Sequence, residues 1–266
     1  MTDPIRQTAL RALDALTFTG VWTALAAGAL TWACGAALVA GGGPPQLARA
    51  CALAAFGTLV VYGIDRLRDV ERDAATSPAR SDFVSRHRGA LFGLVVAGVA
   101  GSALAAWRLP AGAWWLCAAV AAAGLLHRRL KDRTRHAAVY VSVAWLAVVA
   151  GLPAVLAQTS GLRVGRLLAI ALGVGLAIAA NALASEWRER RYEARAAVTL
   201  RVSRRLAAAG ALAPLLVPGL AGLAWVGGCV LLSVALFRPD ERYGLVVLDG
   251  ALLVGALCAG LWLAAV

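Results

Sequence analysis

Three aspartates at the end of an apolar stretch are spaced so that they could bind a cation. Asp65, Asp69 and Asp73 stand four residues apart in VYGIDRLRDVERD, residues 61–73. On a helix this spacing places three carboxylates on one face, where like charges repel one another. A bound cation would offset the repulsion, and carboxylates without a cysteine or histidine partner favour a hard cation such as Mg²⁺. The stretch is therefore a candidate magnesium site.

A second stretch repeats the pattern further along the chain. In NALASEWRERRYE, residues 181–193, the oxygen-bearing residues Asn181, Ser185, Glu189 and Glu193 have the same spacing. Two such helix ends facing one cavity would clamp a diphosphate through several Mg²⁺ ions, while nearby arginines neutralise the remaining charge. The metal would stabilise the departing diphosphate, and a dry apolar pocket would protect the carbocation left behind.

The elements that must position these residues are membrane-spanning helices. Of the 266 residues, 61% are hydrophobic, and the mean hydropathy is +0.75, whereas a soluble domain is closer to half apolar. Nine apolar runs are long enough, or nearly so, to cross about 30 Å of hydrocarbon. The sequence therefore predicts an all-α membrane protein, with about nine transmembrane helices around a central cavity and a single domain over residues 1–266. The approximate runs are 18–40, 46–64, 89–107, 110–126, 137–158, 164–186, 206–221, 223–237 and 244–265.

The basic residues predict the orientation of this bundle. The chain has 26 lysines and arginines and a formal net charge of +12. All but four of them lie before the first run or after an even-numbered run, the exceptions being Arg49, Arg108, Arg163 and Arg166. By the positive-inside rule the N-terminus is cytoplasmic, with residues 1–17 as a cytoplasmic segment. The positive charge of the protein then suits contact with anionic lipid headgroups or with an anionic substrate that arrives from the cytoplasm. We expect no nucleic-acid partner.

Several residues allow a chemical role and a plainer one. Either acidic stretch, taken alone, can be a solvated helix end whose arginines pair with the acids. Asp249 lies well inside the ninth run, where an unpaired carboxylate costs about 2.5–3.5 kcal/mol. It should face the bundle interior, either as a cavity residue or paired with an arginine such as Arg242. Tyr140 can line the cavity or fill the core. The five cysteines lie in apolar runs without a CxxC pair, so we interpret them as buried side chains.

Together these residues resemble the UbiA superfamily of intramembrane prenyltransferases, nine-helix proteins with aspartate-rich motifs after helices two and six. The first family motif, N-D-x-x-D-R-x-x-D, is matched at Asp65, Arg66 and Asp69. The fourth run ends in LLHRRLK, which places Lys131 on the family's basic phosphate-binding position. SEWRERRYE corresponds to the second motif and keeps its arginine as Arg188.

The resemblance covers residues 50–205 and departs from the family inside both motifs. TSPAR and VAWLAVVAG are similar to further family elements. Val61 and Tyr62 replace the asparagine and aspartate that open the first motif, and Ser185 takes an asparagine position in the second. Glu189 and Glu193 stand where aspartates are usual, so metal affinity and substrate length are expected to differ from typical members.

The resemblance implies a Mg²⁺-dependent prenyltransferase that transfers a prenyl group from a polyprenyl diphosphate to an aromatic or other lipophilic acceptor. It implies a multi-pass protein of a bacterial inner membrane, with the active site facing the cytoplasm. The catalytic residues would be Asp65, Asp69 and Glu189. The metal ligands would be Asp65, Asp69, Asp73, Asn181, Ser185, Glu189 and Glu193. The substrate-binding residues would be Tyr62, Arg66, Arg68, Lys131, Tyr140, Arg188 and Asp249.

Two other functions fit the same residues. Asn181, Ser185 and Glu189 have the N-x-x-x-S-x-x-x-E spacing of the second metal motif in class I terpene cyclases. A UbiA-type membrane terpene cyclase, which needs no acceptor, therefore stays open. The altered motif residues also leave open a non-catalytic lipid-binding or transport protein on the same scaffold. Release of diphosphate and a terpene from one substrate would identify the cyclase.

Overall fold

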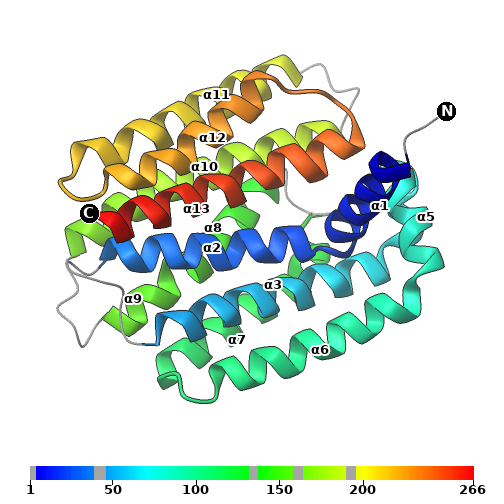
Figure 1. Ribbon diagram of the computed structural model, residues 1–266, viewed down its shortest axis with the longest axis horizontal. Coiled ribbons are helices and arrows are strands. Elements are labelled where there is room, and N and C mark those ends of the chain that lie inside the picture. Colours follow the sequence, from blue (N-terminus) through cyan, green and yellow to red (C-terminus); the bar gives the residue numbers. More distant parts are fainter. Residues whose placement is uncertain (1–3, 39–45, 132–136, 158–163, 190–195) are drawn as a thin grey trace.

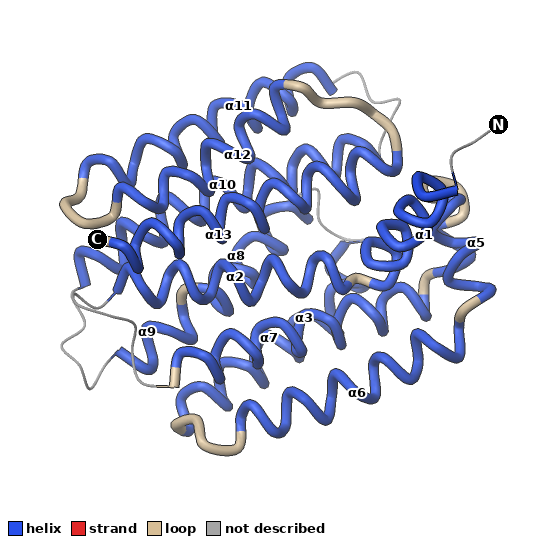
Figure 2. Tube along the Cα trace, viewed as in Figure 1, coloured by secondary structure: helices blue, strands red, loops and turns tan. Residues whose placement is uncertain are grey.

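Helices make up nearly all of the described chain. The computed structural model describes residues 4–38, 46–131, 137–157, 164–189 and 196–266, and no β-strand occurs in these ranges (Figure 2). Runs rich in alanine and leucine favour helix. In lipid, a helix also satisfies its own backbone hydrogen bonds. The predicted all-α class is confirmed.

The helices are labelled in chain order. The first half contains α1 (Pro4–Thr19), α2 (Val21–Leu38), α3 (Leu47–Arg68), α4 (Val70–Asp73), α5 (Pro78–Arg86), α6 (Arg88–Ala106) and α7 (Ala111–Lys131). The second half contains α8 (Ala137–Val149), α9 (Gly151–Ala157), α10 (Val164–Glu189), α11 (Ala196–Leu212), α12 (Ala224–Ala235) and α13 (Asp249–Ala265). Between them lie two short 3-10 turns, η2 (Ala213–Leu216) and η3 (Ala221–Leu223), and a π-helix, η4 (Tyr243–Leu248).

Within the described ranges, six helical segments are long and apolar enough to cross a membrane. They are Val21–Leu38, Leu47–Arg68, Arg88–Ala106, Ala138–Ala157, Val164–Arg188 and Tyr243–Ala265. The shorter apolar helices Ala111–Gly124 and Ala221–Ala235 occupy two more of the predicted runs. These segments are consistent with the integral membrane protein that the composition predicts.

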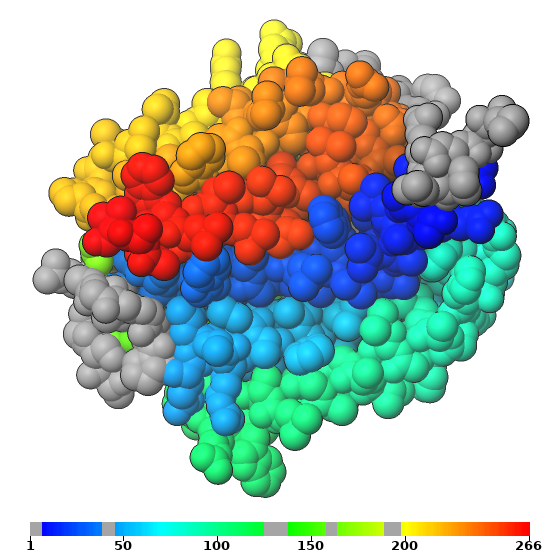
Figure 3. Space-filling model, in the orientation of Figure 1, coloured from blue at the N-terminus to red at the C-terminus, as the bar shows by residue number. Residues whose placement is uncertain are grey.

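The long helices lie side by side (Figure 1). α2 packs between α3 and α13, and the ring continues through α12, α10, α8 and α7 back to α3. On one face of the molecule α13, α2 and α3 follow one another without a break (Figure 3). Small residues bring helices close together: at Gly227 of α12, an added Cβ would lie 2.2 Å from the backbone nitrogen of Ala211 in α11.

The polar stretches that follow the second and sixth apolar runs contain further helices. Residues 66–88 contain α4 and α5, and residues 196–205 begin α11. α5 starts with Pro78 in its first turn, a position where the missing N–H has no cost. It packs on α1 through Phe83, whose ring meets that of Phe18 with centroids 5.5 Å apart. Such short amphipathic helices are too polar to appear as apolar runs.

Candidate functional site

A cavity of about 220 Å³ lies among α2, α3, α8, α10 and the η4–α13 segment and reaches α5. We call it the polar cavity, because most of its charged and hydrogen-bonding lining lies at one end of these helices. It brings together nine of the residues predicted from sequence: Tyr62, Asp65, Arg66, Asp69, Asp73, Asn181, Ser185, Arg188 and Asp249. The lining also includes four polar residues that were not among those predictions: Thr23, Arg72, Arg80 and Glu186.

The three aspartates stay in register although α3 ends between them. α3 ends at Arg68, and Asp69 follows with φ −105° and ψ 18°. The Asp69 N–H still donates to the Asp65 carbonyl at 2.9 Å, and the Asp73 N–H donates to the Asp69 carbonyl at 2.8 Å. The helical spacing therefore continues into α4, and all three aspartates line the polar cavity, as the four-residue spacing predicts.

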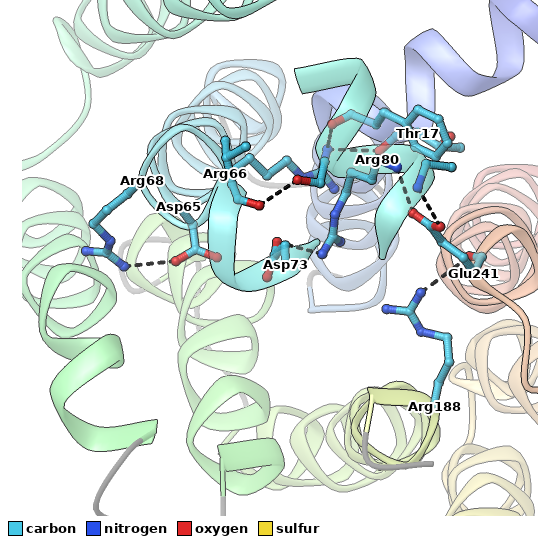
Figure 4. Close-up of polar contacts among 12 residues, drawn as sticks. Thr17, Asp65, Arg66, Arg68, Asp73, Arg80, Arg188 and Glu241 are labelled. Carbon is cyan, nitrogen blue, oxygen red and sulfur yellow. Dashed lines mark hydrogen bonds and ion pairs between the residues drawn. The ribbon is translucent and has the colours of Figure 1, made fainter. Parts of the chain in front are cut away.

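Arginines neutralise this stripe of carboxylates. Arg68 contacts Asp65 at 2.9 Å and Asp69 at 3.3 Å, and Arg80 contacts Asp73 at 2.7 Å (Figure 4). The Asp65 side chain remains 46% exposed, whereas that of Asp69 is 14% exposed. The pairs offset the repulsion within the stripe, and Asp65 offers the more accessible carboxylate.

Arg66 is buried and anchors the end of α1. Its Nη1 donates to the Thr17 carbonyl at 2.9 Å and also to the Phe18 carbonyl. Gly20, which has a φ of 86°, turns the chain from α1 into α2, and a Cβ there would lie 3.1 Å from the same nitrogen. Arg66 thus satisfies carbonyls at a helix C-terminus, a role that the motif did not predict, while its side chain also lines the polar cavity.

α10 supplies the opposite wall of the polar cavity. Asn181, Ser185 and Arg188 all line it. Arg188 lies across Gly244 of η4, where an added Cβ would be 2.6 Å from its Cδ atom. Close packing of this kind restricts the side-chain conformation of Arg188. Three predicted positions, the side chains of Glu189 and Lys131 and the whole of Glu193, lie outside the described residues.

Glu241 connects the two walls. Its carboxylate accepts hydrogen bonds from the backbone N–H groups of Ala79 at 3.1 Å and Arg80 at 2.8 Å, in the first turn of α5. Its main-chain carbonyl accepts from Arg188 Nη1 at 3.4 Å (Figure 4). A carboxylate is stabilised at a helix N-terminus. No local sequence pattern predicts the contact between Glu241 and α5, because the bonded residues are 161 or more positions apart.

Asp249 lies with Thr23 and Asn181 at the inner end of the polar cavity. The Thr23 hydroxyl donates to Asp249 Oδ2 at 3.2 Å, and Asn181, Arg66 and Arg188 also lie near Asp249. Arg242 instead pairs with Asp14, at 2.8 Å. Of the two roles that the sequence allows for Asp249, the structure therefore favours the cavity residue. Thr23 was not predicted, because a single threonine in an apolar run is too common to indicate a site.

Two apolar cavities adjoin the polar one. The larger, of about 300 Å³, lies among α2, α3, α6, α7 and α8, and we call it the apolar cavity. The other, of about 260 Å³, contains Arg68 and Tyr140, which do not line the polar cavity. Tyr62 and Trp145 line all three. Trp145 Nε1 donates to the Tyr62 hydroxyl at 3.2 Å, and the rings meet edge to face with centroids 6.4 Å apart. This aromatic pair forms the boundary between polar and apolar space.

The carboxylates fit a metal ion that takes only part of its ligands from the protein. Among the described residues, no three His, Cys, Asp or Glu side chains are grouped so as to hold an ion. Mg²⁺ usually retains waters and takes only one or two protein carboxylates, together with phosphate oxygens. Asp65 and Asp69, which line the same cavity, provide such a pair. Their pairing with Arg68 would have to loosen when the ion binds.

No family model, curated protein or solved structure matches the chain. The resemblance to the UbiA superfamily therefore stays a prediction from the sequence motifs.

Proposed function

We propose that the chain is a Mg²⁺-dependent intramembrane prenyltransferase of the UbiA type, with about nine transmembrane helices and its N-terminus in the cytoplasm of a bacterial cell. It would transfer a prenyl group from a polyprenyl diphosphate to an aromatic or other lipophilic acceptor. The observation that carries the proposal is the direct contact between the polar cavity and the apolar cavity at Tyr62 and Trp145. A prenyl diphosphate has the same two parts, a charged head and an apolar chain.

The head group would lie in the polar cavity. Arg72, Arg80 and Arg188 line it and supply positive charge, and arginine binds phosphate oxygens through paired N–H groups. Lys131 would join them at the end of α7. Mg²⁺ bound by Asp65, Asp69 and Glu189 would supply the Lewis acidity that stabilises the departing diphosphate.

The prenyl chain would lie in the apolar cavity. Its lining is mostly aliphatic, with Val60, Val61 and Val148 among the contributors, so it would exclude water from a reactive carbocation. Tyr62 and Trp145 stand where the head group meets the chain, and their ring faces could stabilise positive charge developing there.

The first test is magnesium-dependent diphosphate release by purified protein in lipid nanodiscs. Farnesyl and geranylgeranyl diphosphates are supplied with Mg²⁺ or EDTA, each with and without a mixture of aromatic acceptors. We expect release only with Mg²⁺. Asp69→Ala and Glu189→Ala should each lower it by about a hundredfold or more, as does loss of one group that stabilises transition-state charge.

Asp82→Ala is the matched control, because it removes an exposed carboxylate of α5 that pairs with Arg86 outside the cavity. It should keep the wild-type rate. Release that persists in EDTA or in Asp69→Ala, or no release under any of the four conditions, would contradict the proposal.

A membrane terpene cyclase is the second candidate, and one observation favours it. Asn181 and Ser185, the first two positions of the N-x-x-x-S-x-x-x-E spacing, line the polar cavity together. A cyclase would release diphosphate and a terpene hydrocarbon or alcohol in the reactions without acceptor. Product analysis of those reactions separates the two enzymes, because a transferase would form an adduct only when an acceptor is present.

A further inference from the structure

The inner end of the polar cavity contains a buried hydrogen-bond acceptor to which none of the described residues donates. Asn181 lines the cavity and is only 6% exposed. Its Oδ1 atom makes no hydrogen bond to any residue that the structure describes. A buried amide oxygen in this state costs free energy unless a ligand donates to it. The atom therefore indicates a ligand group that carries a hydrogen.

The groups around Asn181 also present oxygen to the cavity. Asp249 accepts from the Thr23 hydroxyl through Oδ2, at 3.2 Å, so the hydrogen of that hydroxyl is already used. The nearby Arg66 directs Nη1 at two backbone carbonyls of α1, and Arg188 directs Nη1 at the carbonyl of Glu241. The side-chain oxygens of Thr23, Asn181 and Asp249 therefore lie together at the inner end of the polar cavity.

The charges there favour a neutral ligand group. An anion entering beside Asn181 would be repelled by Asp249, and a cation would be repelled by Arg66 and Arg188, which are the charged neighbours of Asp249. A hydroxyl group avoids both repulsions and donates one hydrogen to an oxygen acceptor.

We propose that Thr23, Asn181 and Asp249 form a subsite that binds the hydroxyl group of a lipophilic phenol or alcohol, with Asn181 Oδ1 as the acceptor. The polar cavity, at about 220 Å³, is smaller than a typical pocket for a whole ligand, about 300–1,000 Å³. Only the hydroxyl end of the phenol or alcohol would therefore bind here, and its apolar part would extend past Tyr62 and Trp145. The inference rests on the proposed function only in taking this ligand to be the acceptor of the transfer.

The test compares two ligands that differ only in the hydroxyl hydrogen. 4-Nonylphenol and 4-nonylanisole are titrated into wild-type protein in nanodiscs by calorimetry, with heats from empty nanodiscs subtracted, and without Mg²⁺ or diphosphate. We expect the wild type to bind the phenol about tenfold more tightly, the effect of one hydrogen bond to a buried acceptor.

Asn181→Leu keeps the approximate volume of the side chain and removes the acceptor. It should lower the phenol affinity to that of the anisole while the anisole affinity stays at the wild-type value, which shows that the pocket remains folded. Asp249→Asn is the second variant and carries the test if Asn181→Leu does not fold. It should weaken phenol binding severalfold and leave anisole binding unchanged.

Ser102→Ala is the matched control. Ser102 Oγ is also buried without a hydrogen bond to the described residues, but it belongs to the apolar cavity, so its loss should leave the preference for the phenol intact. The proposal would be overturned if the wild type bound the two ligands equally well, or if Asp249→Asn left phenol binding unchanged. It would also be overturned if Ser102→Ala lost the preference for the phenol while Asn181→Leu kept it.

The outcome is separable from that of the diphosphate assay. If the protein prefers the phenol but does not release diphosphate with Mg²⁺, the subsite stands and the transferase proposal is wrong. If it releases diphosphate but binds phenol and anisole equally, the transferase proposal stands and the subsite is wrong.

Discussion

The polar cavity and the apolar cavity share three helices, α2, α3 and α8, and differ in which turns of those helices they use. α3 contributes Val60 and Val61 to the apolar cavity and, about one turn later, Asp65 and Arg66 to the polar cavity. α2 and α8 also line both. Along the shared helices, depth therefore separates the two environments. Tyr62 and Trp145 lie where one environment changes to the other.

A glycine in each cavity offers the largest contrast. Gly244→Ala places a Cβ 2.6 Å from Cδ and 2.8 Å from Nε of Arg188, so that arginine must move. We expect diphosphate release to fall by about a hundredfold, the effect of misplacing a positioning group by about 1 Å. Initial rates at saturating substrate measure it.

Gly57→Ala is the counterpart in the apolar cavity. An added Cβ there meets no atom within 4 Å. The rate should stay at the wild-type value, and the helix should gain about 0.5–1 kcal/mol. If the two alanines had equal effects on the rate, the packing of Arg188 on Gly244 would be irrelevant to catalysis.

Narrowing the apolar cavity should have a smaller and more selective effect. Ala144 lines both apolar cavities and does not line the polar one. Ala144→Phe fills part of the space assigned to the chain, so we expect the ratio of kcat/KM for geranylgeranyl over farnesyl diphosphate to fall by about tenfold. Affinity for inorganic diphosphate should not change. If Ala144→Phe lowered the affinity for inorganic diphosphate as well as the kcat/KM ratio, the diphosphate and not the prenyl chain would lie near Ala144.

The boundary between the cavities should give the smallest effect. Tyr62→Phe and Trp145→Phe each remove one partner of the 3.2 Å hydrogen bond. The double variant should be less destabilised than the sum of the two single variants by about 1 kcal/mol, the usual worth of such a bond. Unfolding in mixed micelles measures the coupling. Strict additivity would mean that the bond contributes nothing and that the rings pack independently.

Some of this arrangement follows from the sequence because it depends on composition and spacing. Apolar runs predict helices, and the interval between Asp65, Asp69 and Asp73 predicts their common face. The sequence does not predict that Arg68 and Tyr140 lie outside the polar cavity. α3, which contains Arg68, and α8, which contains Tyr140, are apolar on most of their faces, so the period of their apolar residues does not show which side faces the polar cavity.

Contacts between segments far apart in the chain could not be predicted from the sequence either. Thr23 meets Asp249, 226 residues away, and Glu241 meets the start of α5, 161 residues or more away. Such pairs depend on how the helices close into a ring, which no local pattern specifies. The expectation that the ends of α3 and α10 share one cavity required only that both ends lie on the same side of the bundle.

The π-helix before α13 determines where Asp249 points. In η4, residues Tyr243–Leu248, the turn holds one residue more than an α-helical turn. Since each α-helical residue advances the chain by about 100°, that extra residue rotates everything after it, beginning with Asp249. Removing it would turn the carboxylate away from Thr23 toward a neighbouring helix or the lipid. The inner end of the cavity thus depends on a count of residues in one turn, so an insertion or deletion there would alter it more than most substitutions.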